Sequence, residues 1–263
     1  MNTISRPISR RKAEKRRIQK LKLFCTIALM GLLIFIVTRT INATQWISVY
    51  DRMIYEQKGY PESLINLAEK NPETAQFVKD YENYENYEGN PDDIDISKEV
   101  EKGEIPLFLQ WDERWGYEKY GSDFLAITGC GPTCLSMVYC GLTGKTDLNP
   151  YEMSKLASEG GFYVAGSGSS WSMMEDLAAQ IGLTVHKVTF DAEHIMAALQ
   201  EGHPIICIMG PGDFTTTGHF IVLTGVDRNG NIKINDPNSR KNSEKTWNLD
   251  DIMPQIRNIW SYS

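Results

Sequence analysis

The sequence predicts an α+β fold in which helices come first and antiparallel strands follow. Apolar residues recur with helical spacing in several segments between residues 130 and 200. Residues 204–209 form a continuous apolar run with the length of a buried strand. Residues 218–226 and 231–237 flank Asn229-Gly230, a dipeptide typical of tight β-hairpin turns. Because the helical and strand patterns are segregated along the chain, a doubly wound parallel sheet is disfavoured.

Charge divides the chain into a basic tail and an acidic body. Residues 1–22 carry nine Lys or Arg and one acid, a net charge of +8, although the whole chain has a net charge of −7. Residues 51–104 have a net charge of −9, and residues 105–263 have a net charge of −7. This acidic balance argues against nucleic acid binding by the folded part.

Residues 23–41 are predicted to form a single transmembrane helix that acts as a signal anchor. The stretch 23–38 has no charged residue, and with its flanks it approaches the ~20 residues that span a bilayer. Because the basic tail precedes it, the positive-inside rule places residues 1–22 in the cytoplasm and the later part of the chain outside the cell membrane. A cleaved signal peptide is the alternative, because residues 41–43 offer a passable cleavage site. Both interpretations export residues 105–263.

Residues 44–104 are predicted to form an acidic helical stalk or linker. Apolar residues after Pro61 have helical spacing, and this helix is predicted to end near Asn71-Pro72. A second short helix is predicted from Pro72 through Val78. Residues 81–95 are acidic and rich in Tyr and Asn without apolar periodicity, which predicts a loop. We assign no chemistry to this region.

Residues 105–263 are predicted to form the domain that carries the chemistry. Gly144 is expected to end the helix that contains the first cysteines of the domain, and Asn149-Pro150 is expected to open the next helix. The predicted order is a short strand (105–110), the cysteine helix (130–142), a helix from 150 that Gly160-Gly161 stops, a flexible loop (166–171) followed by a helix, a strand (183–190), a helix (192–199), an apolar strand (204–209) and the hairpin.

Cys130 is the candidate nucleophile. Glycines flank it, and Pro132 follows in what is predicted to be the first turn of a helix, where proline is tolerated. The free N–H groups and the positive dipole end at a helix N-terminus favour a thiolate, and such placement can lower a cysteine pKa from about 8.5 to roughly 3.5–7.5. The alternative is a small buried apolar residue, which is what most free cysteines are.

His219 and Asp236 are the candidate partners of this thiol, because a thiol nucleophile needs a base and a group that orients the base. A two-residue turn or a four-residue loop in the hairpin would place both side chains on one face, and the four-residue loop makes them diagonal neighbours about 7–8 Å apart. A single bulge would break this parity. The alternatives are a histidine at a strand end and an Asx turn. The other three histidines are predicted to be surface or turn residues.

Gln110 is the candidate oxyanion donor, together with the backbone N–H of Cys130. A carboxamide directly after an apolar run suits this role, although a lone glutamine is commonly a surface residue. Cys134 lies on the same predicted helix face as Cys130, and Cys140 and Cys207 are interpreted as core residues, with a disulfide possible. There is no Cys-x-x-Cys or His-x-x-His spacing in the sequence, so we expect no zinc site and no other cofactor.

Five motifs occur in an order that resembles a known enzyme family. They are residues 110–116 (QWDERWG), 129–133 (GCGPT), 168–171 (GSSW), 218–220 (GHF) and 235–237 (NDP). Residues 105–263 thereby resemble the C39-like branch of papain-fold cysteine peptidases, found as exported or membrane-anchored proteins of Gram-positive bacteria. The resemblance implies that a helical part carries Cys130 and that an antiparallel sheet carries His219 and Asp236.

The resemblance also implies roles for individual residues and a class of substrate. Cys130 would be the nucleophile, His219 the general base, Asp236 its orienting group and Gln110 an oxyanion donor. Ser170, Trp171 and Gly129 would bind a peptide or protein substrate. We therefore expect a membrane-anchored extracytoplasmic cysteine peptidase or amide hydrolase. An acyltransferase on the same fold and a catalytically silent cell-wall binding module are the alternatives, and the retention of all four catalytic positions favours an active enzyme.

Overall fold

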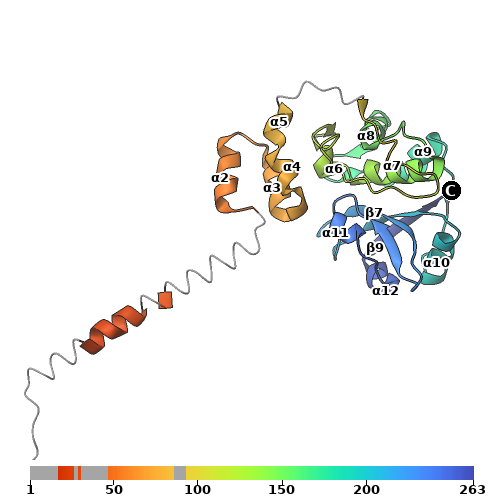
Figure 1. Cartoon of the computed structure of the whole chain (residues 1–263). Helices are drawn as coiled ribbons and strands as arrows, with labels where there is room; N and C mark the ends of the chain where they lie inside the picture. Colours follow the sequence, from red (N-terminus) through yellow and green to blue (C-terminus); the bar gives the residue numbers. More distant parts are fainter. Residues whose placement is uncertain (1–16, 27–28, 31–46, 86–92) are drawn as a thin grey trace, which may run out of the picture. The chain divides into compact units, whose positions relative to one another are not determined.

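The computed structural model describes residues 17–26, 29–30, 47–85 and 93–263. They belong to two compact units, residues 1–58 and residues 59–263 (Figure 1). In the first unit, residues 17–26 are helical and α2 (Val49–Gln57) begins after a capping box in which Ser48 and Asp51 bond reciprocally. In the described residues no helix is both long and apolar enough to cross a membrane. Most of the predicted span 23–41 lies outside the described residues.

The second unit begins with a group of short helices, which we call the helical module (residues 59–85). It consists of α3 (Glu62–Lys70), η1 (Pro72–Thr74), α4 (Ala75–Lys79) and α5 (Tyr81–Glu85). The two helices predicted on either side of Asn71-Pro72 are confirmed. The predicted loop is wrong for residues 81–85, because Tyr81 and Tyr84 stand one helical turn apart and both pack against the ring of Tyr117. The compact unit thus includes part of the segment assigned to a stalk.

A layer of helices follows in the chain: α6 (Leu125–Thr128), α7 (Cys130–Thr143), α8 (Pro150–Glu159) and α9 (Met173–Gln180). Gly144 ends α7 in the left-handed conformation, with φ of 73°, as predicted for a C-terminal glycine. Asn149 caps α8 by accepting hydrogen bonds from two backbone N–H groups of its first turn. Figure 1 shows this layer above the strands of the sheet.

Two short hairpins accompany these helices, β1 (Lys119–Tyr120) with β2 (Asp123–Phe124) and β3 (Tyr163–Val164) with β4 (Gly168–Ser169). The loop predicted at 166–171 is therefore partly wrong, because its centre pairs as a strand. The strand predicted at 105–110 is also wrong. Asn235 Nδ2 donates to the carbonyl oxygens of Ile105 and Pro106 at 3.0 and 2.8 Å, and Pro106 has no N–H to continue a ladder.

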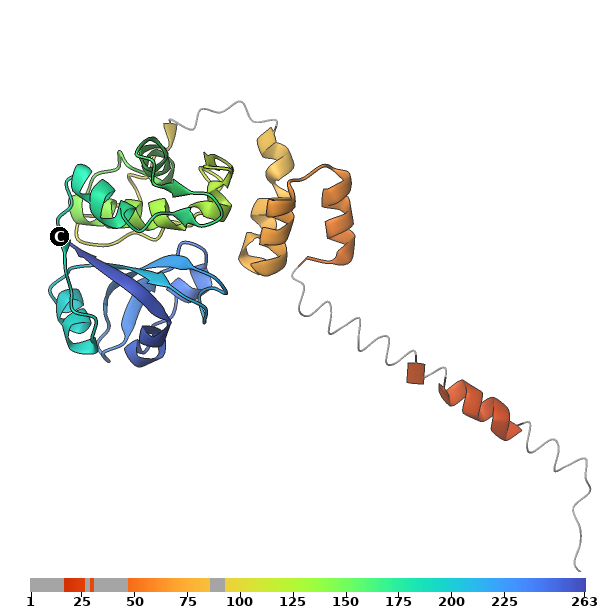
Figure 2. The same cartoon turned by 180° about the vertical axis from the view of Figure 1, so that it is seen from behind.

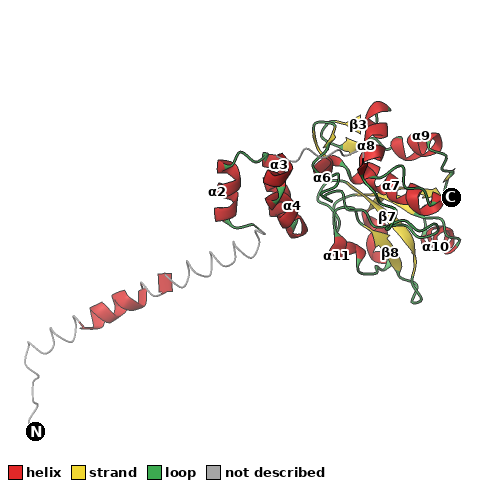
Figure 3. Cartoon of the chain, turned by 45° about the horizontal axis from the view of Figure 1, so that its top comes forward, coloured by secondary structure: helices red, strands yellow, loops and turns green. Residues whose placement is uncertain are grey.

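The sheet is antiparallel and has the strand order β5-β9-β6-β7-β8. Its strands are β5 (Val185–His186), β6 (Ile205–Met209), β7 (His219–Val226), β8 (Ile232–Asn235) and β9 (Ile256–Tyr262). Only two residues of the predicted strand 183–190 pair. The strand β9 lies between β5 and β6, and no sequence pattern predicted it. Figure 3 shows β7 and β8 side by side. The predicted α+β class is confirmed.

The β7–β8 hairpin has neither of the two turn lengths considered. Asp227 N donates to Asn231 O at 2.8 Å, so the loop has three residues, and Gly230 supplies the left-handed residue with φ of 83°. A bulge at Thr224 then adds one residue to β7. The three-residue loop and the one-residue bulge together have the same length as a four-residue loop. Val222 therefore pairs with Asn235, which is the pairing predicted for the four-residue loop.

The two faces of the sheet bury separate cores. One face packs under α7, α8 and α9, with Phe220, Val222 and Trp260 among the buried residues. The other face packs against α10 (Ala192–Gln200) and α12 (Leu249–Ile252), with Ile221 and Leu223 among them. Figure 2 shows α10 and α12 on the side of the sheet opposite the helical layer. Before the bulge, successive residues of β7 thus enter different cores, as the alternation of a strand requires.

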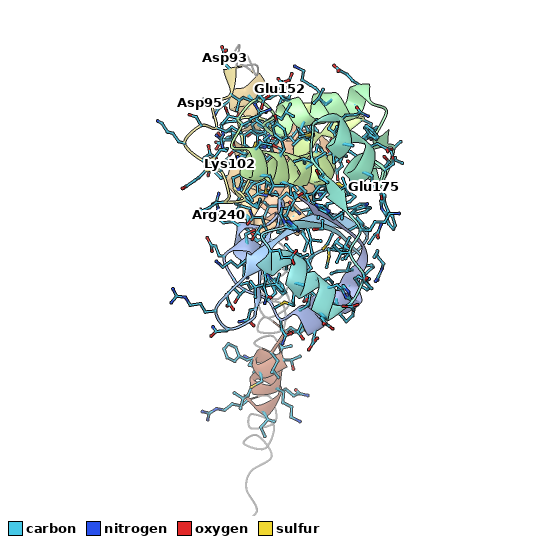
Figure 4. All side chains as sticks on the ribbon, turned by 90° about the vertical axis from the view of Figure 1, so that its right-hand side faces the viewer. Asp93, Asp95, Lys102, Glu152, Glu175 and Arg240 are labelled. Carbon is cyan, nitrogen blue, oxygen red and sulfur yellow. The ribbon has the colours of Figure 1, made fainter. Side chains whose placement is uncertain are left out.

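Charged side chains lie at the margin of the helical layer. Figure 4 labels four acids there, Asp93, Asp95, Glu152 and Glu175. Of the remaining short elements, α11 (Arg240–Ser243) follows β8 and η3 (Met253–Gln255) precedes β9.

A small number of polar side chains are buried in the domain, and they include Gln110, His219 and Asp236. Buried polar side chains need a partner or a function, so these residues lead to the site.

Candidate active site

Cys130 is the first residue of α7, and its thiol is partly buried. Its two glycine neighbours leave room that a side chain would fill. A Cβ on Gly129 would collide with the carbonyl oxygen of Leu125, and a Cβ on Gly131 would lie 2.5 Å from Ser169 Oγ. The glycines therefore allow close packing around the cysteine, and the helix N-terminus presents its unpaired N–H groups to the sulfur.

His219 lies between Cys130 and Asp236. Its Nε2 is 2.7 Å from Asp236 Oδ1, and the exposed fractions of the two side chains are 8% and 2%. A carboxylate can only accept, so Nε2 carries the proton and Nδ1 is the ring nitrogen left for the Cys130 thiol. The hairpin thus brings the histidine and the aspartate together, as its register near the site predicts.

Asp236 is held on both oxygens by residues that follow it in the chain. Its Oδ1 also accepts a hydrogen bond from the backbone N–H of Asn238 at 2.9 Å, and its Oδ2 accepts one from Asn242 Nδ2 at 2.8 Å. Hydrogen bonds to an ionised carboxylate are stronger than neutral ones. The carboxylate is therefore fixed in the orientation that reaches His219. Neither Asn238 nor Asn242 belongs to one of the five sequence motifs, so their contacts with Asp236 were not predicted.

The pKa values of Cys130 and His219 are shifted in opposite directions. Burial would raise the pKa of the Cys130 thiol, but the hydrogen bond and positive charge of His219 outweigh burial, and the N–H groups of Phe220 and Gly131 add to them, so the pKa is lowered. Burial would lower the pKa of His219, but the charge and hydrogen bond of Asp236, followed by Cys130, raise it to about 10. The site therefore favours a thiolate beside an imidazolium.

Gln110 is buried close to the helix turn that precedes the cysteine. Its Nε2 donates to the backbone carbonyl of Ala126 at 2.7 Å, and its Oε1 has no hydrogen-bond partner in the described part of the chain. Reversing the amide would place Oε1 against the Ala126 carbonyl oxygen, so the observed orientation is the favourable one. A carboxamide nitrogen has two N–H groups, and Ala126 uses one of them. The second is available for another acceptor.

A cleft of about 660 Å³ opens at Cys130 and His219. Trp171, which was predicted to bind substrate, lines this cleft, and its indole ring is half-exposed. The ring packs edge-on against the ring of Trp260. The other two predicted binding residues are placed differently. Ser170 forms a hydroxyl pair with Ser172 at 3.1 Å, and Gly129 precedes α7 with its N–H bonded to Leu125. Neither is a lining residue of the cleft as the described residues define it.

Ser169 and Tyr120 form a hydroxyl pair beside the cysteine that the sequence analysis missed. Their oxygens are 2.7 Å apart and buried, and Ser169 lines the cleft. Burial raises the pKa of Tyr120 to about 12, so its hydroxyl remains a hydrogen-bond donor at neutral pH. Ser169 lies inside the 168–171 motif, which could have identified it. Tyr120 stands in no motif.

The other cysteines and histidines lie outside this arrangement. The described cysteines are all free, and burial raises the pKa values of Cys134, Cys140 and Cys207 above the usual thiol value. His194 pairs with Asp191 on an exposed surface. Within the described residues, no cluster of three or more possible ligands could hold a metal ion.

The chain thus brings together a thiol at a helix N-terminus, a histidine at the start of β7 and an aspartate directly after β8, which are the kinds of group that a thiol hydrolase needs. The comparison with protein families agrees with this class. The model of the Peptidase_C39 like family matches residues 102–263, so the chain belongs to this family, which indicates a cysteine peptidase. No curated protein that was compared matches the chain. The helical module lies before the matched residues.

Proposed function

We propose that this protein hydrolyses amide bonds of peptides or proteins with Cys130 as nucleophile, His219 as general acid and base, and Asp236 as the group that orients His219. The observation that carries the proposal is the position of His219. One ring nitrogen bonds the Asp236 carboxylate at 2.7 Å and the other faces the Cys130 thiol, whose pKa is lowered mainly by this histidine against the opposing effect of burial.

The proposed reaction has two stages. The Cys130 thiolate attacks the carbonyl carbon of the substrate, and the carbonyl oxygen becomes an oxyanion as the C–S bond forms. His219 donates its Nδ1 proton to the departing amine when the C–N bond breaks, leaving a thioester. A water molecule then attacks the thioester while His219 takes its proton. Collapse of this second intermediate breaks the C–S bond, releases the acid and restores the thiolate and imidazolium.

We propose Gln110 and the Cys130 backbone N–H as donors to the oxyanion. Support for Gln110 comes from its burial and from the bond to Ala126, which holds the amide and leaves its second N–H unused. Support for Cys130 comes from its place at the start of α7, where N–H groups have no intrahelical acceptor. Removing one such donor costs about 10²–10³ in rate in related enzymes.

We also propose that residues 23–41 anchor the enzyme in the cell membrane, with the peptidase domain outside. The sequence supports this by its uncharged stretch and the basic residues before it. Membrane fractions washed with alkaline carbonate should retain the full chain and release a variant that lacks residues 1–44. Recovery of the full chain in the wash would refute the anchor.

The catalytic proposal is tested with a thiol-reactive peptide probe on the purified full chain. A Cys25→Ser background removes an exposed thiol outside the site. The probe should label this parent, and neither Cys130→Ser nor His219→Ala should be labelled at a comparable rate. His194→Ala is the matched control, because it also removes a histidine bonded to an aspartate. Equal labelling of His219→Ala and His194→Ala would overturn the proposal.

A further inference from the structure

We propose that Asn71 and Glu73, in the helical module, are positioning residues for Asp236. This inference rests on the proposed function. Both residues lie where α3 passes into η1, outside the residues 102–263 that match the family. They contact the segment 238–241, directly after the proposed orienting aspartate. Asn71 is connected by hydrogen bonds to Oδ1 of the Asp236 carboxylate, and Glu73 is connected to Oδ2.

Asn71 acts on the first oxygen through Asn238. Its Nδ2 donates to the backbone carbonyl of Asn238 at 2.7 Å and to Asn238 Oδ1 at 3.2 Å. The backbone N–H of the same residue donates to Asp236 Oδ1, the oxygen that contacts His219. Trp111 Nε1 shares the Asn238 carbonyl at 3.1 Å. The position of Asn238 is therefore set from the helical module and from residue 111 together.

Glu73 acts on the second oxygen through α11. Its Oε1 accepts from Ser239 Oγ at 2.5 Å, and its Oε2 accepts from the backbone N–H of Lys241 at 3.2 Å. Ser239 caps α11 by accepting the N–H of Asn242, whose side chain donates to Asp236 Oδ2 at 2.8 Å. The acidic side chain thus also satisfies an unpaired donor in the first turn of this short helix.

Separate contacts attach the helical module to the domain. The rings of Phe77 and Tyr117 stack with centroids 4.1 Å apart, and Tyr84 OH donates to Glu118 Oε1 at 2.9 Å. A Cβ on Gly116 would lie 2.8 Å from the Phe77 ring, so this glycine permits the approach. Attachment and positioning can therefore be separated by mutation.

The positioning role predicts a specific kinetic signature. Without Asn71 or Glu73, Asp236 loses support for the orientation that holds His219, and small misplacements of catalytic groups can cost roughly 10²-fold in rate. We expect Asn71→Ala and Glu73→Ala to lower kcat roughly 10-fold or more with little change in KM. The pH at which the Cys130 thiol becomes reactive should rise in both variants. Glu73→Gln keeps one acceptor oxygen for Ser239 and should recover part of the loss.

The experiment measures kcat, KM and the pH profile of Cys130 alkylation by iodoacetamide in the full chain with Cys25→Ser. Tyr84→Phe is the matched control, since it removes a bond of the module that does not lead to Asp236. An equal loss of kcat in Tyr84→Phe, or an unchanged alkylation profile in Asn71→Ala, would overturn the inference. If an alanine variant does not fold, Glu73→Gln and Ser239→Ala give the same test. An alkylation profile that His219→Ala does not shift would instead refute the proposed function.

A second inference, carried by different observations, concerns the substrate. We infer that Arg257 forms a subsite for a carboxylate of the peptide, either an acidic side chain or a free C-terminus. This inference also rests on the proposed function. Arg257 lines the cleft that contains Cys130 and His219. Its guanidinium is always charged and presents a planar set of donors that matches a carboxylate.

The backbone directs Arg257 to this place. Ile208 pairs with Asn258 and Met209 pairs with Ile256, so Arg257 is the extra residue of a bulge in β9. Bulges near active sites redirect side chains. A Cβ on Gly210 would collide with three atoms of the Arg257 side chain, so the glycine leaves the space that the guanidinium occupies.

The guanidinium is bonded only to backbone carbonyls among the described residues. Its Nη1 donates to the carbonyl oxygens of Pro254 and Ile256 at 3.1 and 3.3 Å. Asp123 also lines the cleft, but it accepts hydrogen bonds from Ser63 and from its own neighbour Phe124. Among the described residues that line the cleft, Arg257 is thus the only arginine or lysine. Its positive charge is therefore left for a ligand.

The test uses pairs of peptide probes that differ by Asp against Asn at one position, and a pair with a free or amidated C-terminus. The parent should react roughly 10-fold faster with one charged member than with its neutral partner, since a charge-assisted bond is worth more than a neutral one. Arg257→Gln should abolish this preference, and Arg257→Lys should retain part of it. Arg228→Gln, in the exposed hairpin loop, is the control and should retain all of it.

Two results would overturn the inference. One is a preference for the charged probe that survives in Arg257→Gln, and the other is a parent protein that shows no such preference with any probe pair. Failure of every probe to label Cys130 would count against the proposed function instead.

Discussion

Replacing Asp236 by asparagine separates the charge of this residue from its shape. The amide oxygen of the introduced asparagine could still accept from His219 Nε2 and from the Asn238 N–H, and the Asn242 amide could reverse to accept from the new NH₂ group. The substitution therefore turns charge-assisted hydrogen bonds into neutral ones. Bonds to charged groups contribute about 1.5–3 kcal/mol and neutral ones about 0.5–1.5 kcal/mol, so the imidazolium loses roughly 1–1.5 kcal/mol of stabilisation.

That loss corresponds to about one pKa unit, or a factor of about 10 in rate. In the wild type the pKa of His219 is raised and that of Cys130 is lowered, so the thiolate–imidazolium pair exists above the thiol pKa and below the imidazole pKa of about 10. Asp236→Asn should lower the pKa of His219 and raise that of Cys130, which narrows this pH window from both sides. Asp236→Ala leaves three donors without an acceptor and should cost about 3–5 kcal/mol of stability as well.

The assay is the rate of Cys130 alkylation from about pH 5 to about pH 10 in the Cys25→Ser background, together with peptide hydrolysis and thermal unfolding. The acid inflection should move to higher pH in Asp236→Asn, with hydrolysis reduced about 10-fold and unfolding little changed. An inflection that stays at the wild-type pH would refute the reasoning. Equal effects of Asp236→Asn and Asp236→Ala would also refute it, because charge and shape would then not be separable.

The other predictions concern the surroundings of the cysteine. Gly131→Ala places a Cβ 2.5 Å from Ser169 Oγ, so this overpacking should destabilise the fold by about 1–3 kcal/mol and lower Tm. Iodoacetamide at neutral pH should modify Cys130 and spare the three buried cysteines, whose pKa values are raised, as peptide mass spectrometry would show. Leu135→Ala removes a fully buried side chain of α7 and should cost about 2–5 kcal/mol in denaturant unfolding, with the alkylation profile unchanged.

The parts of the fold with strong local signals were predictable. Gly144 and Asn149-Pro150 marked the end of α7 and the start of α8, because a left-handed glycine and an N-cap with proline at N1 act within one turn. The proximity of His219 and Asp236 followed from hairpin parity. The loop length did not, because a three-residue loop and a bulge give the same pairing as four loop residues, and parity alone cannot distinguish them.

The parts fixed by long-range packing were not predictable. β9 entered no prediction, although it pairs with both β5 and β6. The α5 helix depends on rings of the domain more than thirty residues away, so its local sequence indicated a loop. For the same reason the contacts of Asn71 and Glu73 with residues after 236 were invisible, since they join positions 166–168 residues apart.

The compensation in the β7–β8 hairpin constrains how this chain can tolerate insertions and deletions. A slip of β8 by one position against β7 would turn Asp236 away from His219, because a single-residue slip exchanges the faces of a strand. Deleting Thr224 and inserting one residue at 228–230 would keep Val222 opposite Asn235, because a four-residue loop without the bulge gives the same pairing. Opposite length changes at the loop and at the bulge should therefore preserve catalysis.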